Sequence, residues 1–325
     1  MSEGSVDQSA QHSQLCGELA SEVAKVLVGQ DAMVSRLLIG LLTGGHVLLE
    51  GVPGLAKTLT VRVLAQAIDT GFSRIQFTPD MLPADVIGTE VFNPRDATYS
   101  IKKGPIFSNL ILADEINRAP AKVQAALLEA MQERQVTIDG VSHPVPRPFL
   151  VVATQNPIEF EGTYPLPEAQ LDRFLIRIGV GYPSSEAEWE IIRDRAERGT
   201  DEVELSSVIG SGRLRAMQEA VERVHMEEDV GRYIVSLVGA TRSHSQVLVG
   251  ASPRGSLAIM KMARARALLA GLDFVTPDDA KAVAVPALSH RLILRPEAWV
   301  RDITSTQVVE ELLDTVPTPP TAPRH

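Results

Sequence analysis

The sequence predicts an α/β fold with a parallel sheet, followed by a smaller all-helical domain. Up to residue 181, apolar runs with the length of buried strands alternate with amphipathic helical stretches. A Gly-rich turn joins the first of these runs to a helix, and ligands of parallel sheets bind at such turns. From residue 186 onward, the apolar residues recur at helical spacing.

Composition indicates an ordinary globular protein. The chain has 325 residues, of which 44% are hydrophobic and 22% charged. We expect a cytoplasmic protein, because no apolar run is long enough to cross a bilayer and no signal-peptide pattern opens the chain. The single cysteine, Cys16, excludes an intramolecular disulfide and a Cys-based zinc site. A net charge of −10 argues against nucleic acid as the first choice of partner.

The N-terminal region is expected to hold a tail and two helices before the first strand. Residues 1–14 are polar and predict a disordered tail. Apolar residues at helical spacing predict helices over residues 15–28 and 32–42. Residues 46–50 read His-Val-Leu-Leu-Glu and predict the first buried strand of the sheet.

A phosphate-binding loop is predicted directly after this strand, where residues 51–58 read Gly-Val-Pro-Gly-Leu-Ala-Lys-Thr. The backbone N–H groups of such a turn form an anion nest, and the helix expected over 59–68 adds its N-terminal dipole. Lys57 is expected to reach the β- and γ-phosphates of ATP, and the Thr58 hydroxyl to bind Mg²⁺. The predicted nucleotide-binding residues are Gly51, Val52, Pro53, Gly54, Leu55, Ala56, Lys57, Thr58 and Leu59.

The loop departs from the usual pattern at one position, where Ala56 replaces the Gly that commonly precedes the Lys. Alanine is the smallest residue after glycine, so a helical backbone is still feasible there. The alternative for the whole motif is a plain Gly-Pro turn, because short motifs also match by accident.

The rest of the first domain is expected to complete the sheet. Further strands are predicted at residues 74–78, 110–113, 149–153 and 175–178, and helices at 79–87 and 122–134. Two hairpins are also predicted, one around residues 93–98 and one around Asp139-Gly140, a pair typical of tight hairpin turns.

Two adjacent carboxylates, Asp114 and Glu115, follow the strand predicted at 110–113. The carboxyl ends of parallel strands are where such folds bind ligands. Asp114 is therefore expected to help hold Mg²⁺, and Glu115 to take a proton from the water that attacks the γ-phosphate. The alternative is an acidic start to the next helix.

Three more polar residues are candidates for the same site. Asn156 follows the strand at 149–153, and either this Asn or the strand-end Thr154 is placed to orient the attacking water, although Asn-Pro is also a common turn. Arg173 ends a short predicted helix, either as a surface ion-pair residue or as an arginine finger toward a neighbouring subunit. Arg254 follows an N-cap Ser252 and a Pro253, and it binds phosphate or is exposed without a role.

The order of these motifs resembles the MoxR family of AAA+ ATPases over about residues 15–315. The most specific stretch is Leu-Ala-Asp-Glu-Ile-Asn-Arg-Ala-Pro at residues 112–120. It is accompanied by Ala-Thr-Gln-Asn-Pro, Leu-Pro-Glu-Ala-Gln-Leu-Asp-Arg-Phe and Ser-Pro-Arg further along the chain. Alanine before the Walker A lysine is usual in that family, which accounts for Ala56.

The resemblance implies a role for each candidate residue. Lys57 and Thr58 correspond to Walker A, Asp114 and Glu115 to Walker B, Asn156 to sensor 1, Arg173 to the arginine finger and Arg254 to sensor 2. The segments 89–104 and 135–145 are similar to the helix-2 insert and the pre-sensor-1 hairpin of this branch of AAA+ proteins. The resemblance places both segments toward a central pore.

The resemblance also implies a function and partners. It predicts a Mg²⁺-dependent ATPase that assembles into a homo-oligomeric ring, expected to be hexameric. Its clients would be proteins, including von Willebrand factor A domain proteins, and the ring would remodel or mature complexes as a chaperone does. Two alternatives are an AAA+ motor associated with nucleic acid and a nucleotide-gated scaffold without turnover. The acidic charge disfavours the first, and the presence of Glu115 and Arg173 disfavours the second.

The expected domain organisation follows from these patterns. An AAA+ nucleotide-binding domain spans residues 15–181, and a linker follows it. A helical lid domain spans 186–315, and a Pro-rich disordered tail spans 316–325. The lid helices are predicted at residues 186–198, 212–224, 230–242, 256–270 and 278–287.

Overall fold

The computed structural model describes residues 3–320 except 53, 54, 56, 96, 157–163, 201, 202 and 204, and only the backbone of 3–10. By their internal contacts, the residues form two compact units. The α/β unit comprises Glu18–Phe174 and Ile178–Arg215, and the helical unit comprises Met1–Gly17, Leu175–Arg177 and Ala216–His325.

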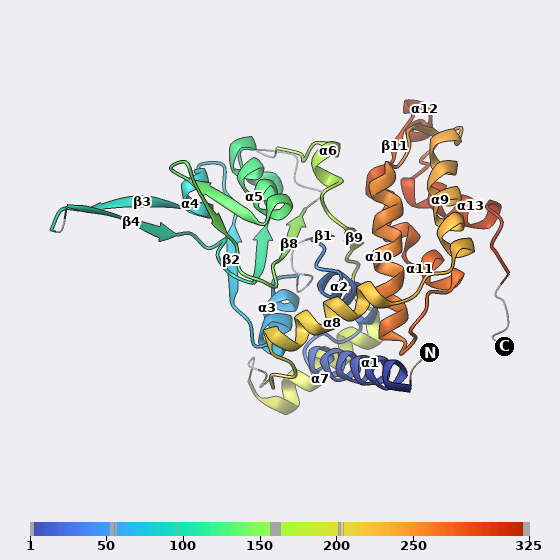
Figure 1. Cartoon of the computed structure of the whole chain (residues 1–325), viewed down its shortest axis with the longest axis horizontal. Coiled ribbons are helices and arrows are strands. Elements are labelled where there is room, and N and C mark those ends of the chain that lie inside the picture. Colours follow the sequence, from blue (N-terminus) through green and yellow to red (C-terminus); the bar gives the residue numbers. More distant parts are fainter. Residues whose placement is uncertain are drawn as a thin grey trace. The chain divides into compact units, whose positions relative to one another are not determined.

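The α/β unit contains the predicted strands and most of the predicted helices (Figure 1). Its elements are α2 (Asp31–Leu42), β1 (Val47–Glu50), α3 (Lys57–Ala67), β2 (Phe72–Gln76), α4 (Pro83–Ile87), β3 (Gly88–Asn93), β4 (Thr98–Lys103), β5 (Leu110–Asp114), η1 (Ile116–Arg118), α5 (Ala121–Glu133), β6 (Gln135–Ile138), β7 (Val141–Pro144), β8 (Leu150–Gln155), α6 (Glu168–Leu171) and α7 (Ser185–Arg198). Residues of α1 (Glu3–Ala24), β9 (Ile176–Gly179) and α8 (Ser211–Arg223) are divided between the two units.

The central sheet has the strand order β2-β5-β8-β1-β9. Strands β2, β5, β8 and β1 pair in parallel, which confirms the predicted parallel sheet. All five residues of β5 are buried, because helices cover both faces of a parallel sheet.

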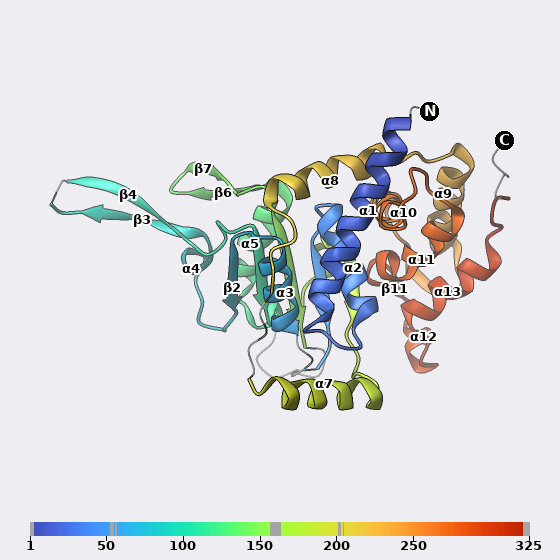
Figure 2. The ribbon, with the colours of Figure 1, turned by 90° about the horizontal axis from the view of Figure 1, so that it is seen from below.

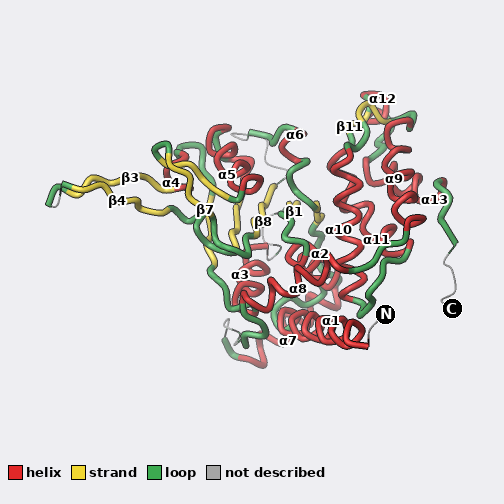
Figure 3. Tube along the Cα trace, viewed as in Figure 1, coloured by secondary structure: helices red, strands yellow, loops and turns green. Residues whose placement is uncertain are grey.

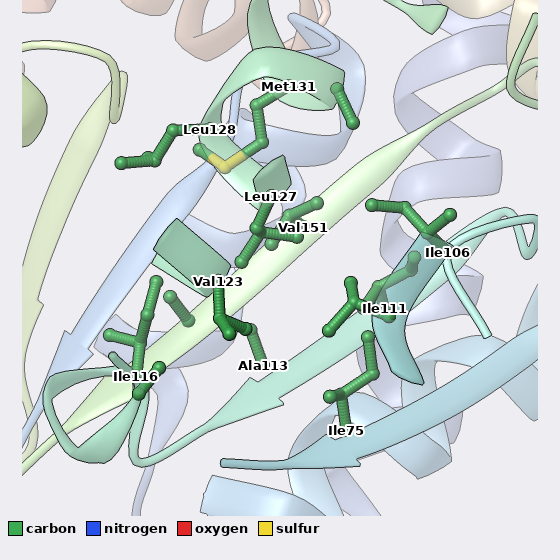
Figure 4. Packing of buried hydrophobic residues seen from close by; sticks show 14 of the residues in the cluster. Ile75, Ile106, Ile111, Ala113, Ile116, Val123, Leu127, Leu128, Met131 and Val151 are labelled. Atoms are coloured by element: carbon green, nitrogen blue, oxygen red, sulfur yellow. The ribbon is translucent and has the colours of Figure 1, made fainter. Parts of the chain in front are cut away.

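The core on one face of this sheet lies between the central strands and α5. Side chains of alternate residues on β5 and β8 point toward that helix, as the two-residue period of a strand requires. Figure 4 shows this cluster, which includes Ile111, Ala113, Val151, Val123, Leu127 and Met131. Each fully buried large side chain contributes about 1.5–3 kcal/mol, so this cluster fixes the register of the strands that carry the candidate site.

Two hairpins project from the α/β unit, β3–β4 and β6–β7 (Figures 1 and 2). The first is the insertion predicted around residues 93–98, and the helix before it is confined to α4. Gly88 begins the hairpin with a φ of 96°, and a Cβ atom there would collide with the backbone of Lys102. The rings of Phe92 and Tyr99 face each other across the strands, with centroids 5.0 Å apart.

His46 fixes the start of β1 from inside the core. Its Nε2 lies 3.0 Å from the carbonyl oxygen of Met131, and its Nδ1 accepts the N–H of Val151 at 3.0 Å. These contacts require a neutral imidazole with the proton on Nε2. Burial, followed by the positive charge of Arg134, lowers the pKa of His46 to about 3.

We expect His46 to make folding sensitive to acid. Between the ordinary His pKa near 6.5 and the folded value, the unfolded chain binds a proton that the folded chain does not, so stability falls as the pH falls. Lowering the pH from 7 to 5 should cost about 2 kcal/mol through this group. Denaturant unfolding at both pH values measures the loss. His46→Gln, which cannot take up that proton, should lose less stability than wild type. An equal loss in both proteins would contradict the prediction.

The helical unit consists mainly of helices and also holds a small antiparallel ladder (Figure 3). Beyond residue 223 it contains α9 (Glu228–Ser243), β10 (Val247–Val249), α10 (Pro253–Leu269), α11 (Pro277–Leu288), η2 (Ser289–Arg291), β11 (Ile293–Leu294), α12 (Pro296–Val300) and α13 (Ser305–Thr315). The antiparallel pair of β10 and β11 corrects the expectation of an all-helical lid. Runs of only two or three residues are too short to give a strand pattern.

The predicted N-cap Ser252 of this unit is confirmed. The Ser252 hydroxyl accepts the N–H of Arg254 at 3.2 Å, and Pro253 takes the first helical position of α10. Thr276 and Asp279 form a reciprocal capping box at the start of α11.

The expected N-terminal tail is wrong for residues 3–14, which belong to α1. The helix continues toward the N-terminus because it has a partner there, since the Ser13 hydroxyl donates to the carbonyl of Leu269 at 2.8 Å. At the other end of the chain, residues 316–320 are neither helix nor strand, and 321–325 lie outside the described residues.

The boundary between the units differs from the expected one, because α7 and the segment up to Arg215 belong to the α/β unit. Gly29 permits this packing, since a Cβ atom there would lie 2.5 Å from the Cβ of Ala187 on α7.

Within the described residues, no helix is both long enough and apolar enough to span a bilayer.

Candidate functional site

Three of the sequence-predicted site residues, Thr58, Asp114 and Glu115, come together at one edge of the sheet in the α/β unit. Asp114 is the last residue of β5 and stands opposite Gln76 of β2. Ala113 stands opposite Ala153 of β8, so Thr154 follows at the level of the acidic pair. The phosphate loop leaves β1 at the same edge, since Glu50 pairs with Gln155.

The described part of the phosphate loop is held close to the backbone of residue 180. A Cβ atom on Gly51 would lie 2.6 Å from the carbonyl oxygen of Val180, so this position requires glycine. Helix α3 begins at Lys57, and the Lys57 Nζ donates to the carbonyl of Gly51 at 2.6 Å. The ammonium group therefore lies beside the first residue of the loop that it is predicted to serve. The predicted loop residues Pro53, Gly54 and Ala56 lie outside the described residues.

Thr58 and Asp114 lie side by side at this edge. The Thr58 hydroxyl is 3.4 Å from Oδ2 of Asp114. A hydroxyl and a carboxylate oxygen are ligands that suit Mg²⁺, a hard cation that takes its remaining ligands from water and phosphate. The described residues contain no cluster of three or more His, Cys, Asp or Glu that would form a metal cage of its own. The pair thus fits a cation that arrives with a nucleotide.

Thr154, the Thr at the end of β8, joins the two carboxylate residues. Its side chain is buried, and its hydroxyl donates to Oδ1 of Asp114 at 2.6 Å. The Thr154 hydroxyl oxygen in turn accepts the backbone N–H of Glu115 at 2.9 Å. Glu115 has a left-handed backbone with a φ of 57°, an uncommon conformation that these bonds help to hold.

Replacing Thr154 by Val should destabilise the α/β unit by about 2–4 kcal/mol. Valine has nearly the same shape, but it leaves the N–H of Glu115 and an oxygen of Asp114 without their buried partner. Thr154→Ser keeps the hydroxyl and should cost about 1 kcal/mol, the value of a lost buried methyl group. Denaturant unfolding of the two variants measures the difference. Equal losses would show that the hydroxyl does not hold the acidic pair.

Two residues of β2 and one of η1 donate hydrogen bonds to the acidic pair, and two of the three carry a positive charge. Arg74 donates to Oδ2 of Asp114 through Nε at 3.1 Å and through Nη2 at 2.6 Å. Gln76 donates to Oε2 of Glu115 at 2.9 Å. Arg118, on η1, donates to the same oxygen at 3.1 Å. Arg74 and Gln76 have a signal in the sequence, because these two polar residues alternate with Ile75 in a strand of a buried sheet.

Asn156 lies just beyond β8 and is buried, at 5% exposure. Its carbonyl oxygen is 3.5 Å from Nδ2 of Asn117, which belongs to the turn after Glu115. The sensor 1 candidate is thus joined to the segment that carries the predicted base. Asn117 was not predicted as a site residue.

Arg173 lies elsewhere in the α/β unit, on the surface formed by α5 and α6. Its Nη1 donates to the carbonyl of Leu128 at 2.9 Å. It lines a hollow of about 240 Å³ together with Glu129, Glu133 and Gln170, and none of the phosphate-loop residues that the structure describes lines that hollow. Within the subunit, Arg173 is therefore not brought into the phosphate site.

Arg254 belongs to the helical unit, where its side chain is exposed in the first turn of α10. Its backbone N–H donates to the hydroxyl of the N-cap residue Ser252. Because the helix dipole disfavours a cation at this end, Arg254 stays a candidate for an anion contact.

A cavity of about 590 Å³ lies beside the start of α3. Its walls come from the loop after α1, from α3 and from α7, and they include Val28, Leu59, Arg62, Ile191 and Arg195. Volumes of this size, with apolar walls and a few polar groups, are typical of small-molecule sites. Of these residues, only Leu59 was predicted from the sequence.

The chain matches two known family models. Residues 46–176 match the ATPase family associated with various cellular activities (AAA), and residues 239–312 match the AAA lid domain. The first match contains the phosphate loop, the acidic pair, Asn156 and Arg173.

Relatives of known name are similar over nearly the whole chain. The chain is 48% identical to Chaperone MoxR1 of Mycobacterium tuberculosis, over 92% of this chain and 81% of that protein. It is 45% identical to the uncharacterised protein YeaC of Bacillus subtilis, over 94% and 95% of the two chains. It is 32% identical to Protein MoxR of Methylorubrum extorquens, over 92% and 93%.

A solved structure from Cytophaga hutchinsonii, described as that of a candidate ATPase, has the same fold. Its TM-score is 0.90 at 46% sequence identity, and the match covers 97% of this chain and 98% of that one.

Proposed function

Because the chain belongs to the MoxR family of AAA+ ATPases, we propose that it couples Mg²⁺-dependent ATP hydrolysis to chaperone-like remodelling or maturation of protein complexes. The observation that carries the proposal is the convergence of Lys57, Thr58, Asp114 and Glu115 at one edge of the sheet. The matching relative named as a chaperone supports the client class.

Each residue of the edge has a part in hydrolysis. Lys57 leaves the carbonyl of Gly51 and binds the β- and γ-phosphates. Thr58 and Asp114 hold Mg²⁺, which when bound neutralises charge on the phosphate oxygens. Glu115 accepts the proton of the attacking water, and Asn156 helps to orient that water.

The cavity beside α3 is the proposed place for the base and ribose. It adjoins Leu59, the residue that follows the predicted cation ligand Thr58. Its walls offer apolar surface from Val28 and Ile191 and positive charge from Arg62 and Arg195. This combination suits a nucleotide better than a bare phosphate.

Arg173 and Arg254 complete the site from outside the phosphate edge. Arg173 is proposed to act on the γ-phosphate of a neighbouring subunit in a homo-oligomeric ring, which we propose to be hexameric. Arg254 is proposed to sense the γ-phosphate from the helical unit. Hairpins β3–β4 and β6–β7 are proposed to face the pore of that ring.

Phosphate release from ATP by the purified protein tests the proposal. We expect hydrolysis that requires Mg²⁺ and rises in specific activity with protein concentration. Nucleotide binding without any phosphate release would favour a nucleotide-gated scaffold. Tight, saturable binding of DNA or RNA in a filter assay at low salt, with ATPase stimulated by it, would favour a nucleic-acid motor.

Clients are expected among protein complexes, including partners with a von Willebrand factor A domain. A Glu115→Gln form held in its ATP state should retain such a client, and the Lys57→Ala form should not. Affinity capture with both forms, followed by mass spectrometry, measures the difference. Equal recovery of every protein with the two forms would contradict a nucleotide-dependent client interaction.

A further inference from the structure

Arg74 is placed at the oxygen that the proposed cation would use. Oδ2 of Asp114 accepts both Nε and Nη2 of Arg74, and the same oxygen is the one that lies 3.4 Å from the Thr58 hydroxyl. The other oxygen, Oδ1, is occupied by Thr154. The carboxylate thus has a positioning side, toward Thr154, and a cation side, where Arg74 lies.

The negative charge of Asp114 explains why an arginine lies beside it. The Asp114 side chain is only 11% exposed, and a carboxylate withdrawn from water needs a compensating charge. The guanidinium of Arg74 supplies that charge, while its own side chain is 44% exposed and free to move into solvent. A guanidinium and a dication at the same oxygen repel each other.

We propose that Arg74 is the counter-ion of Asp114 while no divalent cation is bound, and that it competes with Mg²⁺ for this carboxylate oxygen. The proposal rests on the proposed function, since it concerns the cation of the same nucleotide site. Arg74 also donates from Nη2 to Oε1 of Gln76 at 2.5 Å, and Gln76 in turn holds Glu115. Displacement of Arg74 therefore also removes the donor to the Gln76 side chain.

The test compares ADP binding with and without Mg²⁺ by calorimetry, which needs no turnover. The quantity measured is the ratio of the two dissociation constants, in EDTA and in Mg²⁺, because any effect of Arg74 on the nucleotide itself cancels in this ratio. Arg74→Met keeps most of the side-chain stem and removes the charge. Arg118→Met is the matched control, since Arg118 is 42% exposed and pairs with Glu115 instead of Asp114.

Arg74→Met should raise the ratio of the dissociation constant in EDTA to that in Mg²⁺ by about three- to tenfold over wild type. This is the range expected for a charge-assisted, partly exposed pair. Arg118→Met should leave it at the wild-type value. Arg74→Gln, a second neutral variant, should reproduce the rise, and thermal melting confirms that each variant is folded. A wild-type ratio in both Arg74 variants, or an equal rise in Arg118→Met, would overturn the role of Arg74. If Mg²⁺ did not tighten ADP binding to the wild-type protein, the magnesium site of the proposed function would instead be overturned.

Discussion

Glu115→Gln should bind Mg·ATP about as tightly as wild type while ATP turnover falls by about a hundredfold or more. Glutamine keeps the length and planarity of the side chain, and its oxygen can still accept a hydrogen bond from Gln76 or Arg118. It cannot accept the proton of the attacking water. Binding and chemistry should therefore separate at this one residue.

Calorimetry measures the binding and phosphate release measures the turnover of this variant. Glu219→Gln is the control, because it makes the same chemical change on an exposed position of α8. It should leave both quantities unchanged. Normal turnover by Glu115→Gln would assign the proton acceptor to another group at the sheet edge.

Arg173→Ala should bind ATP and yet lose turnover by about a thousandfold, the order of effect known for arginine fingers. The structure places Arg173 on the hollow between α5 and α6, whose lining includes no phosphate-loop residue from the described part of the chain. The residue must therefore act on a neighbouring subunit if it stabilises the charge on the γ-phosphate. Loss of the hydrogen bond to Leu128 is checked separately by thermal melting.

Mixing Arg173→Ala with Lys57→Ala distinguishes action on a neighbour from action within one subunit. The first protein has an intact pocket and the second an intact arginine, so a mixed ring should contain some complete sites. Partial recovery of ATPase activity is expected once subunits exchange, which fluorescence transfer between labelled subunits demonstrates. Demonstrated exchange without any recovery would remove Arg173 from this role.

Site residues that belong to a recognisable sequence motif were predictable. Residues that contact the site only because their strand packs beside it were not. Lys57, Thr58, Asp114 and Glu115 each follow a recognisable strand, and the end of a parallel strand fixes where they lie. Thr154 required the register of β8 against β5, which only the packed core determines.

Arg74 and Gln76 show the same limit more sharply. Their contacts with the acidic pair depend on β2 lying next to β5, although α4 and the hairpin β3–β4 separate these strands in sequence. Strand alternation predicts that both side chains lie on the same face of β2. It does not say which strand lies next to β2 in the sheet. The helical start of α1 was missed for a related reason, since its partner Leu269 lies far away in sequence.

Calorimetry of Mg·ATP binding to Lys57→Ala tests most directly that the loop at residues 51–58 holds the nucleotide phosphates. We predict a loss of affinity of about tenfold or more, because the charge-assisted contacts of Lys57 are removed. Lys122→Ala, an exposed lysine at the start of α5, should bind as wild type does. Unchanged affinity in Lys57→Ala would contradict the assignment of the phosphate loop, and with it the roles given to Thr58 and Asp114.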